Sequence, residues 1–374
     1  EKKYAPLIES VKIDINEVQT IFLEHKDDPL IASNLPPSAG ALSWCRGLQD
    51  RVQFPIEKLK SLDKKVLERE DTRDMLKLYT AILGQMADFD RERVEAWGSS
   101  IEDSSQAKLK NPLLRREFSD ESIHPRLFVH FDPVLIKLLR EVKYFLLLGL
   151  NVPASAMEIF QKAEIFRRHT GNLDLIVNMY NDIQSSLLPV ERPLVKSQLD
   201  KMDRTLAQGV GEGKKAKSLN WKSNGIDLFI EEAMTEAKEV SDLLQMLKGG
   251  LKHIESNTDA WAKDPIFERN GKTATIDDFT ALQKKTRAVK LTTVKETGQD
   301  VHRLLKDINK KLKVSQGLPD WKAYVDFINN IIVYGLIDAA AASLKAMSNQ
   351  LNPDYLIANS MPPLLEIQLD LVDK

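Results

Sequence analysis

Apolar residues recur at steps of three and four along most of the chain, which is the period of an amphipathic α-helix. In the segment 72–97 this spacing puts the following residues on one face: Met75, Leu78, Tyr79, Ile82, Leu83, Met86, Phe89, Val94 and Trp97. The same spacing returns in 240–254 and 301–312, where Lys, Glu and Asp occupy the opposite faces. Each segment therefore predicts a long helix that buries one stripe against a neighbouring helix.

Proline and glycine clusters divide this helical pattern into units. The proline pair in 34–37 separates a first helix from a second that begins near Ala39, and Pro55 is expected to kink the second helix. Pro153 is expected to open a later helix, which the glycine in 170–172 is expected to end. Three further breaks are expected at 188–193, 264–277 and 317–319.

A polar connection rich in Ser, Arg and Pro runs over 111–133, with a short extended piece expected at 127–129. The glycine-rich segment 209–217 predicts a flexible linker. These features divide the chain into a first helical part at 1–110, a middle bundle at 111–208, the linker, and C-terminal bundles at 218–374. The predicted fold class is all-α, an elongated array of consecutive helical bundles.

Composition narrows the functional classes. The 53 Lys and Arg residues nearly balance the 55 Asp and Glu residues, and the net charge of −2 argues against a dedicated nucleic-acid binder. A hydrophobic content of 43% argues against wholesale disorder. The lone Cys45 excludes an internal disulfide framework and a four-cysteine zinc site, so an intracellular protein is expected.

No membrane insertion is predicted from the segment 133–152, which the sequence pattern marks as the most apolar stretch. It carries Lys137, Arg140, Glu141 and Lys143, and four charges are too costly inside a spanning helix. The first residues lack the apolar core of a secretory signal. Because the chain begins with Glu1 rather than Met, we expect it to be a piece of a longer protein.

The glycine-rich linker invites comparison with a phosphate-binding loop. Gly209, Gly211, Gly213 and Lys214 are suitable residue types, but Lys215 stands where a P-loop needs Ser or Thr to coordinate magnesium. The segment before it, 193–208, is expected to be a helix rather than a strand. A solvated linker therefore explains the glycines better than a nucleotide site does.

Residues that carry catalysis or bind metals are not arranged in a known pattern. The six histidines form no i, i+4 pair, and the chain has no GxSxG nucleophile elbow. Cys45, beside Trp44 in a helical pattern, is better explained as a small buried hydrophobe than as a nucleophile. No catalytic, cofactor-binding or metal-binding residue is predicted.

Many amphipathic helices without a chemical motif suggest a scaffold whose surfaces receive partners. The basic clusters at 214–217, 284–287 and 310–313 are typical of solvated helix faces. A non-motor helical adaptor or tether, and an enzyme with an unrecognised site, remain alternatives. Partner contacts are expected first on 284–313 and on the connection 111–130, because long polar loops often carry function.

Several strings are more specific than composition. The segment 34–48 resembles a signature of dynein heavy-chain tails, and 131–145, 171–181 and 190–194 resemble further signatures of that family, in the family's order. The resemblance is dense over 34–230. The residues at 187–193 are similar to those of axonemal, outer-arm members of the family. The residues that carry it are Pro36, Pro37, Gly40, Trp44, Pro133, Leu139, Tyr144, Gly171, Tyr180, Asn181, Glu191, Arg192, Pro193 and Trp221.

The resemblance implies a segment from the N-terminal tail, or stem, of an axonemal dynein heavy chain of the outer-arm type. Such chains are minus-end-directed microtubule motors of the cytoplasm and cytoskeleton, in the axoneme of the cilium or flagellum. The ATPase ring, with its ATP and Mg, lies C-terminal to the tail, so no cofactor is expected here. The implied partners are WD-repeat intermediate chains, light chains, other heavy chains and docking proteins on doublet microtubules, with no nucleic acid.

Elementary packing arguments give the signature residues structural roles. Pro36 and Pro37 should set how the next helix begins, and the small residues at 39–41 should permit close helix approach. Trp44 should fill the space between two helices. The helix at 133–148 is apolar on more than one face, so it is expected to be buried from several sides, with Arg140 and Glu141 paired or peripheral.

Overall fold

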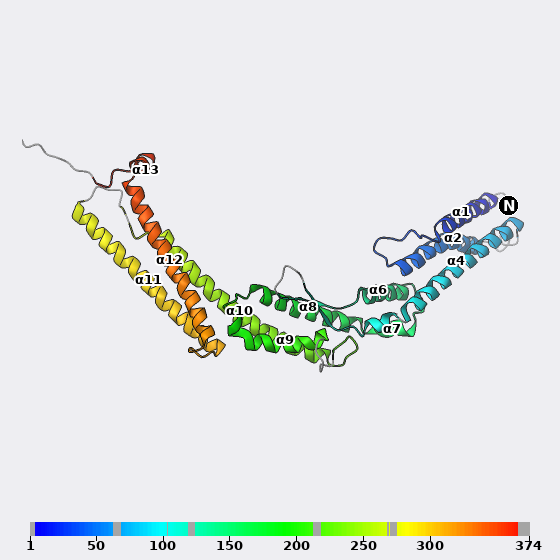
Figure 1. Ribbon diagram of the computed structural model, residues 1–374. Helices are drawn as coiled ribbons and strands as arrows, with labels where there is room; N and C mark the ends of the chain where they lie inside the picture. The colour runs from blue at the N-terminus through cyan, green and yellow to red at the C-terminus, as the bar shows by residue number, and fades with distance from the viewer. Residues whose placement is uncertain are drawn as a thin grey trace, which may run out of the picture. The chain divides into compact units, whose positions relative to one another are not determined.

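A computed structural model describes residues 4–62, 69–102, 104–118, 124–211, 218–267, 269 and 275–365, and helices make up most of them (Figure 1). The helices are α1 Ala5–His25, α2 Pro37–Leu62, α4 Glu70–Glu102, α5 Ser104–Lys108, α6 Pro133–Leu147, α7 Ala154–Gln161, α8 Ala163–Ser186, the 3-10 helix η1 Arg192–Val195, α9 Lys196–Val210, α10 Ile226–Lys263, α11 Ile276–Leu312, α12 Pro319–Leu351 and α13 Pro353–Ala358. The strands β1 Leu114–Glu117 and β2 Arg126–Val129 form a two-stranded sheet. The all-α expectation is confirmed, and the extended piece expected at 127–129 lies in β2.

The chain packs as two compact units. The first comprises residues 1–119, 127–175 and 207–230, and the second comprises 120–126, 176–206 and 231–374. Helices α8, α9 and α10 contribute residues to both units. The division of the sequence at 110, 208 and 217 stays a prediction.

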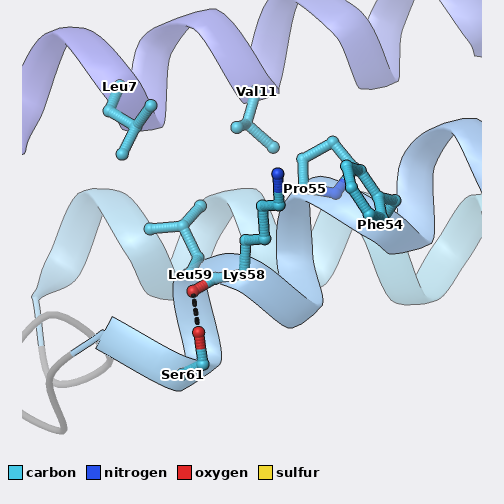
Figure 2. Close-up of a pocket in the computed structure, with 7 residues that line it drawn as sticks. All are labelled: Leu7, Val11, Phe54, Pro55, Lys58, Leu59 and Ser61. Carbon is cyan, nitrogen blue, oxygen red and sulfur yellow. Dashed lines mark hydrogen bonds between the residues drawn. The ribbon is translucent and has the colours of Figure 1, made fainter.

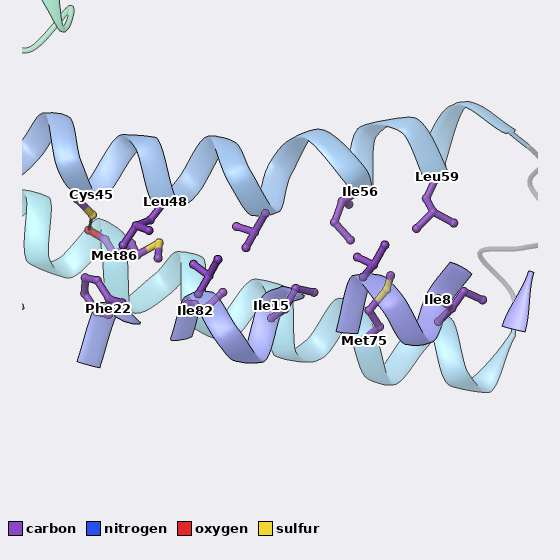
Figure 3. Close-up of a cluster of buried hydrophobic side chains, with 13 residues drawn as sticks. Ile8, Ile15, Phe22, Cys45, Leu48, Ile56, Leu59, Met75, Ile82 and Met86 are labelled. Carbon is purple, nitrogen blue, oxygen red and sulfur yellow. Dashed lines mark hydrogen bonds between the residues drawn. The ribbon is translucent and has the colours of Figure 1, made fainter. Parts of the chain in front are cut away.

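Three helices of the first unit, α1, α2 and α4, pack against one another around a single apolar core (Figure 3). Each helix supplies side chains at steps of three, four or seven, so its apolar stripe faces the other two helices. The buried members are Ile8, Val11, Ile15, Val18 and Phe22 from α1, Cys45, Leu48, Val52, Ile56 and Leu59 from α2, and Met75, Ile82 and Met86 from α4. The amphipathic helix predicted from 72–97 is confirmed.

The start of α2 differs in one respect from expectation. A Cβ atom added to Gly40 would lie 2.4 Å from Cγ2 of Ile31, so the small residue admits the connection that precedes the helix rather than another helix. The helix continues through Pro55 to Leu62. The expected kink at Pro55 stays a prediction.

Helix α6 buries one face, not several. Leu135, Leu138, Val142 and Phe145 are buried, and the Phe145 ring meets Trp97 of α4 edge to face at 4.4 Å between centroids. Ile136, Leu146 and Leu147 are exposed. The expectation that this helix is covered from several sides is therefore wrong, because its second apolar face has no neighbour among the described residues.

Glycine at 171 does not end a helix. A short break at Lys162 divides α7 from α8, and α8 then continues through Gly171 to Ser186. This glycine lies inside the helix, and a Cβ there would meet nothing within 4 Å. The expectation was wrong because Leu173, Ile176 and Val177, all buried, continue the helical stripe past the glycine.

The remaining breaks fall where the sequence predicts them. Helix α8 ends before 188–193, α10 ends at Lys263 before 264–277, and α12 begins at Pro319. Helix α9 extends to Val210, so the first residues of the predicted linker are helical. Residues 212–217 of that linker lie outside the described residues.

In the second unit the long helix α10 contacts both α11 and α12. A Cβ on Gly335 of α12 would lie 2.4 Å from Cβ of Thr258, so glycine permits a close approach to α10. The Ser343 hydroxyl of α12 accepts a hydrogen bond from the Ile266 amide just after α10. Lys290 of α11 forms an ion pair with Asp264.

Helix α12, rather than 133–152, is the more apolar stretch. Among the described residues it is the one helix that is long and apolar enough to cross a membrane, by length and composition alone. Its apolar residues lie on two faces, so they give no single stripe in the sequence pattern. Few residues of its apolar stretch are buried.

Candidate functional site: helix junctions and exposed grooves

The two longest family-like strings meet at one carboxylate. Glu141 of α6 is 5% exposed, and its two oxygens accept hydrogen bonds from the backbone amides of Ser38 and Ala39, both at 2.8 Å. These amides belong to the first turn of α2, which has no helical partner for them. A negative charge at a helix N-terminus is also favoured by the helix dipole. Glu141 therefore fixes the start of α2 on α6.

Arginines strengthen the same junction from both sides. The Arg140 guanidinium donates to the carbonyl of Asn34 at 3.2 Å, and Arg46 of α2 donates to the carbonyl of Leu148. The expectation that Arg140 and Glu141 are paired or peripheral is confirmed. The junction joins residues about 100 positions apart through polar contacts to backbone groups.

A second buried carboxylate organises the second unit. Glu191 is fully buried, and its Oε2 accepts hydrogen bonds from the Leu188 amide at 2.9 Å and from Lys248 of α10 at 2.7 Å. Its Oε1 has no hydrogen-bond partner among the described residues. Burial, and then the nearby Glu191 charge, raises the pKa of Tyr324 in α12 to about 12.

Trp44 packs between helices, as expected, but it is only half-buried. Its ring stacks on Phe22 of α1 at 6.0 Å and meets Phe89 of α4 at 6.2 Å between centroids. Neighbouring Cys45 is buried, which confirms that it is a small core residue. Burial, and then the Asp90 carboxylate, raises the pKa of the Cys45 thiol far above its ordinary range.

Trp221 anchors the loop before α10. Its indole nitrogen donates to the carbonyl of His130 at 2.9 Å, and its ring meets Phe131 and Phe166 at 4.8 and 6.2 Å. It also lines a cavity of about 520 Å³ whose walls come from α5, α7, α8 and the start of α10. The tryptophan therefore has a packing role that spacing alone did not reveal.

His169 and Asp227 line that cavity, and Arg168 contacts the same carboxylate. Nε2 of His169 lies 2.9 Å from Asp227 Oδ1, and Arg168 donates to the same oxygen at 3.0 Å. The hydrogen bond with His169 holds the pKa of the Asp227 carboxyl below its ordinary value. Because Glu158 and Lys162 in the same wall pair with each other, the lining charges largely neutralise one another.

An exposed apolar groove lies between α1 and α2 (Figure 2). It measures about 340 Å³, and its walls are Leu7, Val11, Phe54, Pro55, Lys58, Leu59 and Ser61. Phe54 is 60% exposed, and the Lys58 ammonium lies 4.3 Å from the centre of its ring. The groove offers an apolar floor with one cation at its rim, which suits an apolar side chain of a partner next to an acidic group.

The signature residues fall into three groups by burial. Pro36, Gly40, Tyr180, Glu191 and Trp221 are buried, whereas Pro37, Pro133, Gly171 and Pro193 are exposed. The half-buried members are Trp44, Leu139, Tyr144, Asn181 and Arg192. Arg192 donates to Gln184 at 2.9 Å, so it closes the turn after α8.

Sequence reasoning missed the partners of these residues. It flagged Glu141 as a charge needing compensation, but not the α2 amides that supply it. It did not single out Lys248 at all, because a lysine on a helix is usually solvated. The available signal was an acidic residue in a turn next to prolines, as at Glu191.

Within the described residues, no group of three or more His, Cys, Asp and Glu side chains is placed to hold a metal ion. The described residues form helix junctions, a cavity and an exposed groove. This arrangement is typical of a helical scaffold. The chain belongs to a family of that class. A profile described as "Dynein heavy chain, N-terminal region 1" matches residues 1–229, so the chain is a member of the dynein heavy chain family in that region.

Similar proteins extend this match over the remaining residues. The chain is 34% identical over 403 aligned positions to "Dynein beta chain, flagellar outer arm" of Chlamydomonas reinhardtii, which covers all of this chain and 9% of that protein. It is 28% identical to "Dynein beta chain, ciliary" of Heliocidaris crassispina and 26% identical to "Dynein axonemal heavy chain 9" of Homo sapiens, over 99% of this chain and 8% of each relative. The chain thus spans less than a tenth of the length of these relatives.

Proposed function

We propose that the chain is a segment of the tail of an axonemal dynein heavy chain of the outer-arm type, in the axoneme of a cilium or flagellum. The observation that carries this proposal is the family match over 1–229, continued by similarity to outer-arm and ciliary beta chains along the whole chain. The helical architecture and the buried junctions at Glu141 and Glu191 fit a part that transmits load rather than one that performs chemistry.

The role proposed for the segment is a scaffold for the assembly and anchoring of the dynein arm. Its partners in this proposal are WD-repeat intermediate chains, light chains, other heavy chains and docking proteins on doublet microtubules. The groove between α1 and α2 supports a contact of this kind, because Phe54 and Leu7 present exposed apolar surface beside Lys58.

Capture of purified intermediate chains by this chain tests the scaffold proposal. In the variant Phe54→Asp we expect capture to fall at least tenfold, because a carboxylate in the groove opposes apolar contact. Phe118→Asp is the matched control, since Phe118 is also an exposed phenylalanine of the first unit. Loss with Phe118→Asp alone would assign the contact to the connection 111–130, and capture unchanged in both variants would remove both surfaces.

The motor activity is proposed for the longer protein and not for this segment. We expect the purified chain to show no ATP hydrolysis above buffer. We expect the coding sequence downstream of Lys374 to contain several GxxxxGK[ST] loops, each of which binds ATP phosphates and Mg. A downstream sequence without such loops would favour the non-motor adaptor instead.

A further inference from the structure

Helix α11 (Figure 1) carries lysines along one side. Residues 284, 288, 291, 295, 299, 302, 306 and 310 follow one another at steps of three and four, so they form one line along the helix. Four members of this line are lysines, and none is Asp or Glu. The lysines, which we call the lysine row, are Lys284, Lys295, Lys306 and Lys310.

The lysine row is exposed, whereas the opposite side of α11 is packed. All members of the row are exposed among the described residues. The buried residues of α11 each come two positions after a member of the line, which is about 200° around a helix of about 3.6 residues per turn. They are Thr286, Val301, Ile308 and Leu312. That side meets α10, where a Cβ on Gly250 would lie 3.2 Å from Cδ1 of Ile308.

The carboxylates of the chain do not neutralise the lysine row. Among the described residues the ion pairs of α11 join Lys290 to Asp264 and Arg303 to Asp300, and neither pair includes a member of the row. From the first to the last member the helix rises about 39 Å, at about 1.5 Å per residue. The chain as a whole has a net charge of −2, so this line concentrates positive charge locally. Such a concentration of one sign attracts an anionic partner.

Carboxylates on one flank limit the width of that partner. Glu296, Asp300 and Asp307 each come one position after a member of the line, so they lie about 100° from it. A bilayer or a nucleic-acid duplex is wider than one helix and would bring its phosphates close to these carboxylates, which repel them. A single extended chain can follow the row without meeting them.

The uncharged members of the line argue against two further occupants. They are Ala288, Leu291, Gln299 and His302. Single-stranded nucleic acids stack their bases on aromatic side chains, with contributions from arginine, and the line contains no Phe, Tyr, Trp or Arg. A partner helix needs an apolar seam, and Leu291 is the one large apolar residue of the line. Recognition along the row therefore depends on charge.

We propose that the lysine row binds an extended, glutamate-rich segment of a partner protein. This proposal rests on the scaffold role proposed above and names the chemistry of one partner. Runs of like charge repel themselves into extended, disordered chains that often serve as interaction tails. At about 3.3 Å per residue, about twelve residues of such a chain cover the 39 Å of the row, estimated from the helix rise.

The exposure of the lysines sets the salt dependence of this contact. Each exposed ion pair contributes little by itself, so several lysines must act together. Dissolved salt screens exposed charges, with a Debye length of about 10 Å at about 0.1 M. We therefore expect binding that is measurable at 50 mM NaCl and at least fivefold weaker at 300 mM NaCl.

Fluorescence anisotropy with a labelled peptide of twelve glutamates tests the proposal. We expect the purified chain to bind this peptide but not one of twelve glutamines. The double variant Lys295→Glu with Lys306→Glu should weaken binding at least tenfold, and Lys295→Gln with Lys306→Gln should weaken it by less. The matched control is Lys238→Glu with Lys252→Glu, which changes the net charge equally at exposed lysines of α10 and should keep binding within twofold.

Three results would overturn the proposal. The first is no binding of the glutamate peptide at 50 mM NaCl, and the second is an equal loss in the row variant and the α10 control. The third is tighter binding to a twelve-nucleotide oligothymidylate, or to phosphatidylserine vesicles, that the row variant abolishes. Circular dichroism should show the same helix content in all variants, because every substituted lysine is exposed.

The peptide experiment is independent of the capture of intermediate chains. That capture is expected to depend on Phe54 in the first unit, whereas the lysine row belongs to the second. Capture that Phe54→Asp abolishes, together with no binding of the glutamate peptide, would leave the scaffold role supported and remove the acidic ligand. Binding of the peptide without capture would remove the groove and support the lysine row.

Discussion

The bundle of α1, α2 and α4 and the group of α10, α11 and α12 use the same sequence pattern with opposite results. In the first, every apolar stripe faces two other helices, and residues such as Ile15 and Ile82 are fully buried. In the second, α12 has two stripes, and one remains exposed among the described residues. The pattern therefore shows that a stripe must be covered, but not by which element.

The two buried glutamates differ in how their charge is compensated. Glu141 receives two backbone amides at the start of α2, whereas Glu191 receives one amide and the Lys248 ammonium. A helix terminus supplies fixed dipoles at no cost in side-chain entropy. A lysine must be ordered and partly desolvated, so the loss of either partner has a different consequence.

The largest effect is expected from Lys248→Met, which leaves the buried Glu191 carboxylate without its cation. We expect the second unit to lose about 3 to 5 kcal/mol of unfolding free energy. Urea titration followed by hydrogen exchange of α10 amides measures the loss. The control is Lys252→Met, an exposed lysine of the same helix, which should change stability by less than about 0.5 kcal/mol. Equal losses in the two variants would contradict the role of the ion pair.

The next largest effect is expected from Ile82→Ala in the core of α1, α2 and α4. Because Ile82 is fully buried, truncation removes apolar contacts and leaves a cavity, at a cost of about 2 to 5 kcal/mol. Leu344→Ala on the exposed face of α12 should cost less than about 0.5 kcal/mol, because Leu344 is 63% exposed. Urea unfolding at 1 μM compares the two. A large loss with Leu344→Ala would show that this face of α12 is covered within the chain.

A smaller effect is expected from Glu141→Ala, which leaves the amides of Ser38 and Ala39 without an acceptor. We expect a loss of about 1 to 3 kcal/mol, with faster hydrogen exchange in the first turn of α2. Glu158→Ala removes an exposed glutamate of the same unit and is the control. Unchanged protection of the first α2 turn in the Glu141 variant would show that water replaces the carboxylate.

The smallest effect concerns Cys45, whose thiol pKa is raised by burial. In the unfolded chain this thiol ionises near its ordinary value of about 8.5, while the folded chain keeps the proton. The unfolded state then binds fewer protons, so stability falls as pH rises above about 8.5. Iodoacetamide should label Cys45 at pH 8.5 only after unfolding. Rapid labelling of the folded chain would show that the thiol is accessible.

Most of the fold could be predicted from the sequence, and the failures have a common cause. The single apolar stripe of 72–97 predicted a helix correctly. The break at 317–319 predicted correctly where α12 begins. The predictions at Gly171 and in α6 were wrong because each relied on a local sequence feature, whereas packing between helices decides the outcome. A glycine alone does not end a helix when buried residues continue on both sides. An apolar second face does not by itself bring a neighbour to cover it.

The candidate junctions were predictable only in part. The expectation that Arg140 and Glu141 need partners followed from the cost of burying charge. The partners themselves lie about 100 residues away in the sequence, and no spacing rule connects them. The dynein family was recognisable from ordered strings of residues, and the groove beside Phe54 was not, because it depends on how α1 meets α2.

By itself, the sequence determined the helical class, the main breaks and the family, because these depend on local periodicity and on the order of short strings. The tertiary structure alone decided which amides meet Glu141, which cation meets Glu191, and which of the two faces of α12 is buried. Burial depends on contacts between residues far apart in the chain, and one helix can satisfy its periodicity with either face inward. The exposed face of α12, with Leu344 and Leu351, can be identified only because the structure shows that α10 packs against the opposite face.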